Sequence, residues 1–355
     1  MFRTTLIRIV LAPFALLYGL VVLLINFFYE IDLLKASKFS IPVIGIGNLS
    51  IGGAGKTPHI EYLIELLKDY INVATLSRGY KRETTGFRFV TNDDTARTVG
   101  DEPLQYRRKY QDIVVAVGES RAYAIPQIML KYSQTQTILL DDSFQHRAVE
   151  PGLNILLTAY DNLFTDDYLL PAGRLREWRS GYERADIIIV SKCPKVMDEN
   201  NRQQIIGKIQ PKSYQTVYFS YYEYGYPYYL YNPAQRISLD DKLGVVLLSA
   251  IANTKYLLDY LDDTVGSVFE IEFTDHHMFT TQDIERIIKV YQNTPDERKI
   301  LLTTEKDAMR LELFKDTLKA HNIPVFILPV KVRFHFEESS KFDQQIKNFL
   351  LDFKV

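Results

Sequence analysis

The sequence is organised around the stretch Gly47-Asn-Leu-Ser-Ile-Gly-Gly-Ala-Gly-Lys-Thr-Pro58. The apolar run Ile41–Gly47 before it predicts a buried strand, and the pattern of Pro58–Asp69 after it predicts an amphipathic helix. Glycines between a strand and a helix allow consecutive N–H groups to point at phosphate oxygens, and the helix N-terminus adds partial positive charge. The stretch therefore predicts a phosphate-binding loop in a mostly parallel sheet.

The spacing within this loop matches G-x-x-x-x-G-K-[ST] except at the first glycine, which is Ser50. Lys56 is expected to reach the β- and γ-phosphates of a nucleotide, and the Thr57 hydroxyl to hold Mg²⁺. A glycine-rich turn that binds no nucleotide is the alternative, which the strand, the Gly-Lys-Thr signature and the helix together disfavour. The predicted nucleotide-binding residues are Ser50, Ile51, Gly52, Gly53, Ala54, Gly55, Lys56 and Thr57.

The identity of the nucleotide base is inferred from the absence of a guanine-recognition motif. Guanine recognition needs a strand ending in [NT]-K-x-D, whose aspartate grips the base. Ile187–Pro194 has proline at that position, and Thr304–Asp307 has its lysine one place late. A GTPase is therefore disfavoured, and the sequence favours ATP.

The remaining sequence predicts two α/β units, because 355 residues exceed one ordinary core. From Ile41 onward, short β-branched runs alternate with helical patterns, which indicates a P-loop NTPase-like, mostly parallel sheet with helices on both faces. The tyrosine-rich segment Tyr214–Tyr231 predicts an antiparallel hairpin, and a second series of strands, ending with a helix at Lys341–Phe353, predicts a smaller α/β domain. The expected division is 1–35 for an N-terminal membrane-associated helix, 36–212 for the ATP-binding core, 213–240 for an aromatic β-ribbon linker and 241–355 for the smaller domain.

Composition excludes several classes of protein. Lys+Arg 42 against Asp+Glu 44 gives a net charge of −2, so no overall field points to nucleic acid. An apolar fraction of 46% with 24% charged residues excludes both a disordered chain and a polytopic membrane protein. The single cysteine excludes an internal disulfide and a Cys-rich zinc site. No obligate protein partner is inferred.

The N-terminal stretch Ile9–Phe28 contains no charged residue. About twenty helical residues reach ~30 Å, the thickness of one hydrocarbon core, so we expect one membrane anchor on a soluble body. A cleaved signal peptide is disfavoured because bulky residues follow the stretch. A buried soluble helix stays open as an alternative, since Pro13, Gly19 and Asn26 interrupt the apolar run. Whether the anchor spans the membrane or lies in its interface is also open.

Other polar clusters follow the predicted strands. Asp141 and Asp142 end the apolar strand that begins at Thr137, and an acid next to a phosphate loop completes the ligand shell of Mg²⁺ directly or through water. Without the loop, this pair would be an ordinary turn or helix cap. Four further clusters, each with an ordinary reading as caps, solvated charges or loop residues, are Ser77–Lys81, Gly100–Pro103, Leu169–Glu177 and Thr274–His277.

In their order along the chain, the motifs resemble those of the tetraacyldisaccharide 4'-kinase family of lipid A biosynthesis. The matching segments are Asn48–Pro58, Leu76–Gly79, Gly100–Pro103, Asp141–His146, Leu170–Glu177, Asp275–His276 and Thr304–Asp307. One departure is Ser143, where the family usually has glycine. The resemblance implies transfer of the γ-phosphate of ATP to the 4'-hydroxyl of a tetraacyldisaccharide 1-phosphate, a lipid A precursor. It also implies an enzyme on the cytoplasmic face of the inner membrane.

The resemblance implies residue roles as well. Asp101 is expected to be the general base, with His276 orienting it and Lys56 as the third catalytic residue. The Mg²⁺ candidates are Thr57, Asp141, Asp142 and Glu177, and the candidates for binding the acylated disaccharide lipid are Arg78, Arg174, Arg176, Gln145 and His146. A membrane-tethered P-loop ATPase that drives a protein partner is the alternative function.

Overall fold

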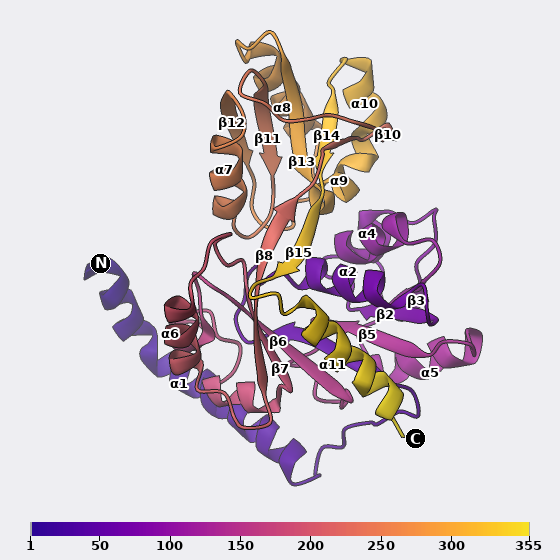
Figure 1. Cartoon of the computed structure of the whole chain (residues 1–355), viewed down its shortest axis with the longest axis vertical. Coiled ribbons are helices and arrows are strands. Elements are labelled where there is room, and N and C mark those ends of the chain that lie inside the picture. Colours follow the sequence, from indigo (N-terminus) through magenta and orange to yellow (C-terminus); the bar gives the residue numbers. More distant parts are fainter. Residues whose placement is uncertain (1, 355) are drawn as a thin grey trace.

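The computed structural model describes residues 2–354 and contains two sheets (Figure 1). One sheet has nine strands in the order β15-β8-β7-β6-β1-β5-β2-β4-β3, and the other has six in the order β10-β9-β14-β13-β11-β12. Figure 1 shows the smaller sheet above the larger one, with the long strands β8 and β15 between them. The predicted class, a mostly parallel α/β fold with an N-terminal apolar helix, is confirmed.

The centre of the larger sheet is parallel. Its strands are β1 (Val43–Asn48), β2 (Val73–Ser77), β4 (Val114–Val117), β5 (Thr137–Asp141), β6 (Leu153–Ala159) and β7 (Ile187–Ser191), and the short edge strand β3 (Arg88–Phe89) is antiparallel. Nearly all residues of the parallel strands are buried, as expected for β-branched runs covered by helices on both faces. The carboxyl ends of these strands therefore open on one side of the sheet, where the phosphate loop begins.

Helices cover this sheet on both faces. On one face, Ile44 and Leu139 pack with α2 (Lys56–Leu67) and α4 (Asp101–Lys109). On the other face, the alternate residues Val43 and Ile138 pack with α5 (Arg121–Lys131). The remaining helical elements of this part are α3 (Ala96–Val99), η1 (Phe164–Asp166), η2 (Arg179–Arg184) and α6 (Glu199–Ile209).

The smaller sheet contains the second series of strands predicted from the sequence. Its parallel strands are β11 (Gly244–Ser249), β12 (Ser267–Glu272), β13 (Lys299–Thr304) and β14 (Val325–Leu328), with the short antiparallel strands β9 (Tyr228–Tyr229) and β10 (Asn232–Arg236) at one edge. Its helical elements are α7 (Lys255–Asp262), α8 (Thr281–Asn293), α9 (Glu305–Leu311), η3 (Glu312–Phe314) and α10 (Lys315–Ala320). The loops after β11 and β12 and the start of α9 face the larger sheet and contribute to the candidate site.

The predicted tyrosine-rich hairpin is wrong. Strand β8 (Thr216–Tyr224) does not pair with the strand that follows it but with β7 and, antiparallel, with β15 (Val330–Phe334), far along the chain. The chain passes from β8 to the smaller sheet and returns through Pro329 to β15, and Gly225 N–H donates to Pro329 O at 3.0 Å where the two passages meet. Two chain segments, hydrogen-bonded to each other, thus connect the sheets.

The C-terminal segment also differs from the prediction. Helix α11 (Ser339–Asp352) was expected in the smaller domain, yet Phe342 and Ile346 are buried in the core of the larger sheet, and Tyr62 donates to Asp343 at 2.7 Å. The periodicity of this segment predicts a helix with one apolar face but does not say which sheet that face covers. Residues 330–352 therefore belong with the larger sheet, and the range 241–355 is not one structural unit.

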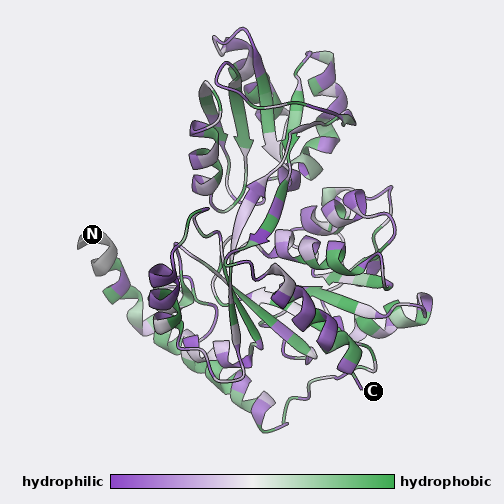
Figure 2. Ribbon diagram, in the orientation of Figure 1, coloured by the Kyte–Doolittle hydropathy of each residue, from purple (hydrophilic) through white to green (hydrophobic). Residues whose placement is uncertain are grey.

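Helix α1 (Phe2–Glu30) lies along the outside of the larger sheet, and Figure 2 shows that hydrophobic residues predominate in it. Within it, Ile7–Glu30 is long enough to cross a membrane and contains an 18-residue window with a mean hydropathy of 2.4. One stripe contacts the body: the Trp178 indole N–H donates to Gly19 O at 2.8 Å, and a Cβ on Gly19 would lie 2.8 Å from the Trp178 ring. The opposite side exposes large apolar side chains such as Leu17, which is 63% exposed.

Candidate active site

The glycine loop joins β1 to α2 and depends on glycine at two positions. Gly52 and Gly55 have φ angles of 115° and 84°, a region that favours glycine over residues with a side chain. A Cβ on Gly55 would also collide with the hydroxyl of Tyr222 from β8. The predicted strand, loop and helix are therefore present, with the loop held open at the N-terminus of α2.

The arginine-rich segment shapes this loop through its main chain. Ser50 forms an antiparallel bridge with Leu175, and Ile51 N–H donates to Arg174 O at 2.8 Å. The bridge supports the loop at the position where Ser50 replaces the usual glycine. The Arg174 side chain, predicted to contact substrate, is exposed and lines neither of the two cavities described below.

Lys56 and Arg176 converge on Asp142. The Lys56 ammonium donates to Asn48 Oδ1 at 3.0 Å and lies 3.4 Å from Asp142 Oδ1. The Arg176 guanidinium donates to both Asp142 oxygens, at 3.0 and 3.1 Å. Burial opposes ionisation of Asp142, but Lys56 and Arg176 outweigh it and hold the pKa of this carboxyl well below its usual range. Two cations thus meet an anion where phosphate oxygens are expected.

Asp141, at the end of β5, has the opposite environment. It is 1% exposed, and its Oδ2 accepts from the Tyr106 hydroxyl at 2.9 Å, whereas its Oδ1 has no hydrogen-bond partner among residues 2–354. Burial, followed by the charge of Glu102, raises the pKa of Asp141 to about 7. A buried, unpaired carboxylate oxygen beside a phosphate loop is a suitable ligand for a hard cation, which stabilises the ionised form.

The other Mg²⁺ candidates differ in how free their oxygens are. Thr57 is buried and lines the cavity beside Lys56. Glu177 accepts from Arg184 at 2.6 Å and from Gln145 at 3.0 Å, so both of its oxygens are hydrogen-bonded. Within the part of the chain that the structure describes, no cluster of three or more His, Cys, Asp or Glu side chains is placed to hold a metal ion. Thr57 and Asp141 therefore fit Mg²⁺ best, with phosphate oxygens and water completing its shell.

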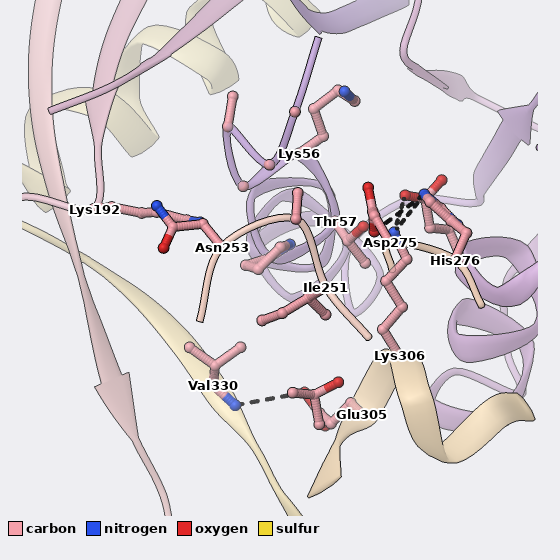
Figure 3. A pocket seen from close by; sticks show the side chains of 18 of the residues that line it. Lys56, Thr57, Lys192, Ile251, Asn253, Asp275, His276, Glu305, Lys306 and Val330 are labelled. Carbon is pink, nitrogen blue, oxygen red and sulfur yellow. Dashed lines mark hydrogen bonds and ion pairs between the residues drawn. The ribbon is translucent and has the colours of Figure 1, made fainter. Parts of the chain in front are cut away.

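A cavity of about 500 Å³ lies between the glycine loop and the smaller sheet (Figure 3). Residues Ile251–Asn253, after β11, form one wall, and a Cβ on Gly53 would lie 3.4 Å from Ala252 Cβ. Lys192, after β7, extends into the same cavity. Burial lowers the pKa of Lys192 to about 8. The cavity thus combines a phosphate loop with walls from both sheets, as required for a bound nucleotide.

Asp101 and His276 meet across the two sheets. His276, from the loop after β12, has its Nδ1 3.0 Å from Oδ2 of Asp101, which begins α4. The Lys306 ammonium lies 3.0 Å from His276 Nε2 and donates to Glu102 at 3.0 Å. An ammonium can only donate, so Nε2 accepts and the ring proton sits on Nδ1, where it donates to Asp101. The predicted pairing of Asp101 and His276 is present, and Lys306 fixes its tautomer.

Asp101 is buried among positive charges. Its Oδ2 also accepts from Arg310 of α9 at 2.5 Å, and the Arg310 side chain is 1% exposed. Burial alone raises the pKa of Asp101, but Lys306, the hydrogen bond from His276 and Arg310 outweigh it and hold the pKa well below its usual range. The carboxyl group is therefore ionised and fixed in orientation.

A second cavity of about 420 Å³ lies between α1 and the carboxyl ends of the strands. It brings together four of the five residues predicted to bind lipid, namely Arg78, Arg176, Gln145 and His146. From α1 it receives Tyr18, whose hydroxyl donates to Arg176 O at 2.7 Å. Burial, followed by the charge of Arg121, lowers the pKa of His146 to about 4, so this histidine is neutral at physiological pH.

Arg121 lines this second cavity and was not predicted. It is 3% exposed and donates to Asp141 O at 3.0 Å, but its Nε and Nη1 have no partner among residues 2–354. Arg310 and Lys306 were also missed. From sequence, Arg121 is the first residue of a helix and Arg310 is an ordinary partner for Asp307 three residues earlier, so neither stands out.

The glycine loop, the strand-end acids and the cavity between the sheets define a P-loop nucleotide-binding protein. A family model described as tetraacyldisaccharide-1-P 4'-kinase matches residues 7–351. The chain belongs to this family, which confirms the resemblance seen in its motifs.

Individual relatives agree with the family model over nearly the full chain. The tetraacyldisaccharide 4'-kinase of Flavobacterium johnsoniae is 42% identical over 347 residues, covering 97% of this chain and 98% of the relative. That of Bacteroides thetaiotaomicron is 40% identical over 355 residues, covering 96% and 92%. Among solved structures, the "apo" form of LpxK from Aquifex aeolicus in complex with ATP has a TM-score of 0.73 and 29% identity, covering 97% of this chain and 99% of that one.

Proposed function

We propose that this protein is a kinase that transfers the γ-phosphate of ATP to the 4'-hydroxyl of a tetraacyldisaccharide 1-phosphate. One observation supports this most directly: the cavity at the glycine loop and the cavity beside α1 share walls, since Tyr80, Glu102, Asp142 and Arg176 line both. A donor in the first cavity and an acceptor in the second therefore meet near the end of the glycine loop. Family membership supports the same reaction.

ATP is expected to lie along the 500 Å³ cavity with its phosphates on the glycine loop. Lys56, which now contacts Asn48 and Asp142, is placed to exchange these contacts for phosphate oxygens. Thr57 and Asp141, with Asp142 and Glu177 as further candidates, would hold Mg²⁺, which when bound neutralises charge on the phosphates. Phosphoryl transfer requires mainly positioning and charge neutralisation, and these residues supply both.

Asp101 is the proposed general base for the sugar hydroxyl. A carboxylate has about four lone-pair sites, and the contacts with His276, Arg310 and the Glu102 N–H occupy three of them. The group can therefore accept the proton of an incoming hydroxyl while its neighbours keep it oriented. Its low pKa makes it a weak base. A weak base is adequate when the hydroxyl proton is transferred while the hydroxyl attacks the γ-phosphate through a loose transition state.

The second cavity is the proposed site for the sugar and its 1-phosphate. The polar groups of Arg78, Arg121 and Gln145 face a space that also contains the neutral His146. A guanidinium with two unused donors, buried in a cavity, is suited to bidentate contact with a phosphate. Arg174, being exposed, is not part of this proposal.

Replacing Arg121 by glutamine is expected to raise KM for the lipid about ten-fold or more, because a charge-assisted hydrogen bond contributes ~1.5–3 kcal/mol. KM for ATP should change less than about two-fold. Initial rates with the lipid and ATP varied in turn measure both values. The control is Arg202→Gln, since Arg202 pairs with Glu338 and lines neither cavity. An unchanged KM for the lipid contradicts the assignment of the cavity.

The proposed location is the cytoplasmic face of the inner membrane, with α1 as the anchor. The exposed apolar side of α1 would contact lipid while its inner stripe stays on the body. Acyl chains leave a bilayer reluctantly, at ~0.8 kcal/mol per buried CH₂, so the enzyme has to meet its substrate at the membrane. ATP is available only on the cytoplasmic side.

Lysine substitutions on the outer side of α1 are expected to release the protein from membranes. Leu17 and Leu24 are exposed, and each lysine at mid-membrane costs roughly 2.5–3.5 kcal/mol. The double variant Leu17→Lys/Leu24→Lys should move to the soluble fraction on ultracentrifugation, whereas Leu17→Met/Leu24→Met should not. If the lysine variant stays with the membranes, the body itself is responsible for attachment. Deleting residues 1–30 is a less specific test of membrane attachment, because the deletion also removes the contacts of Tyr18 and Gly19 with the body.

Incubation with γ-labelled ATP and the lipid, followed by separation of products, tests the proposed function. Label in the lipid supports it, and label only in inorganic phosphate supports the membrane-tethered ATPase instead.

A further inference from the structure

Arg310 lies between the two sheets at the point where they approach the proposed base. It comes from α9, which packs against α4 in the larger part (Figure 1). Its side chain is 1% exposed, although an arginine is rarely buried to this degree unless it is paired. The partners of the buried Arg310 side chain therefore indicate what this residue does.

The guanidinium of Arg310 makes three contacts on two sides of the interface. Nη1 donates to Asp101 Oδ2 at 2.5 Å, and Nη2 donates to Ala250 O at 3.1 Å and to Asp307. Ala250 O also accepts from His276 N–H at 3.2 Å. Ala250 directly precedes Ile251–Asn253, the wall of the nucleotide cavity. One side chain thus contacts the base and the main chain that supports both His276 and the nucleotide wall.

We propose that Arg310 is a positioning residue for phosphoryl transfer: it holds the Asp101 carboxylate in one position relative to the smaller sheet. The proposal rests on the proposed function, because it assigns Arg310 a role in the same reaction. Arg310 lines neither cavity and acts through Asp101. Without it, Asp101 keeps only the contacts with His276 and the Glu102 N–H and loses the hydrogen bond from Nη1 that links its Oδ2 to the smaller sheet.

A purely structural role is the competing explanation, since buried ion pairs often contribute little net stability. The pH profile separates the two, because Arg310 opposes protonation of Asp101. The other titratable or charged groups around Asp101 are Glu102 on its own helix, Lys306 and Asp307 on α9, and Asp275 and His276 after β12, with Lys81 bound to the main chain of the last two. Removing Arg310 leaves Lys306 as the nearest fixed cation, so the pKa of Asp101 rises towards the ordinary range.

The test compares Arg310→Met, Arg310→Lys and Arg108→Met. Arg108 is the matched control, because it reaches from α4 to Glu312, the first residue of η3 directly after α9, at 3.0 Å, without contacting Asp101. For Arg310→Met we expect kcat to fall about 100-fold with KM for ATP nearly unchanged, since misplacing a reacting group costs about this much. We also expect the acid limb of its kcat profile to lie at higher pH than in the wild type, with a midpoint at about pH 4, the ordinary range of an aspartate. Arg310→Lys keeps the charge, so its pH profile should match the wild type and its kcat should be intermediate.

Three results overturn the proposal: a wild-type kcat in Arg310→Met, an equal loss of kcat in Arg108→Met, or an acid limb that does not move in Arg310→Met. If Arg310→Met does not fold, Arg310→Lys decides the question. One ammonium cannot replace the planar guanidinium at all three of its acceptors, so a wild-type kcat in Arg310→Lys contradicts the positioning role. A wild type that labels no lipid refutes the proposed function instead, so the two failures are distinguishable.

Discussion

Lys56→Ala is expected to reduce phosphoryl transfer by about 10³-fold or more. The Lys56 ammonium is held at the end of the glycine loop by Asn48 and Asp142, where the proposed function places the transferred phosphate group. Removing one preorganised donor from such a site costs about 10²–10³ in kcat, and here the donor carries a full charge. Turnover with γ-labelled ATP and the lipid measures the effect.

The control for Lys56→Ala is Lys68→Ala, at the opposite end of α2. Lys68 pairs with Asp69 and Asp112 and has no contact with the loop. It should keep wild-type turnover, while both variants should keep similar melting temperatures. Full activity in Lys56→Ala would refute the assignment of Ser50–Thr57 as the nucleotide loop.

Asp101→Asn is expected to lower kcat by about 10²–10⁴-fold, the usual contribution of a general base. Asparagine has nearly the same shape, so the packing around α4 is kept, but the amide does not accept the proton of the sugar hydroxyl. ATP affinity, measured by equilibrium dialysis, should stay within about three-fold of the wild type because Asp101 does not line the nucleotide cavity. The variant thus separates chemistry from nucleotide binding.

Asp94→Asn is the matched control for this variant. Asp94 is also a buried carboxylate that pairs with an arginine, Arg88, at 2.7 Å, and it lies outside both cavities. A large loss of turnover in Asp101→Asn alone supports the base assignment. Normal turnover in Asp101→Asn removes Asp101 from that role.

Local features of this fold could be read from the sequence, and distant pairings could not. The loop between β1 and α2 is encoded by neighbouring residues, and the parallel strands are apolar because helices cover both faces. The partner of β8 is β15, about a hundred residues away, and α11 covers the larger sheet. Hydrophobic periodicity gives the apolar face of an element but does not identify the surface that it covers.

The candidate site shows the same limit. Asp101 and His276 were paired through the family resemblance, because nothing in their sequence spacing brings them together. Arg310 was missed since an arginine three residues after an aspartate on a helix is common at exposed positions. Its importance comes from the packing of α9 on α4, which makes an otherwise ordinary residue the partner of Asp101.

The double connection between the sheets limits how they can move. A single linker would let the smaller sheet swivel about its own axis, whereas two passages tied by the hydrogen bond from Gly225 to Pro329 allow mainly bending about one line. Bending about that line would keep Arg310, Lys306 and His276 on the same side of α4. The two connecting segments thus help to position the Asp101 carboxylate. Cleavage of the chain or an insertion in either β8 or β15 is expected to lower kcat before it lowers the free energy of unfolding.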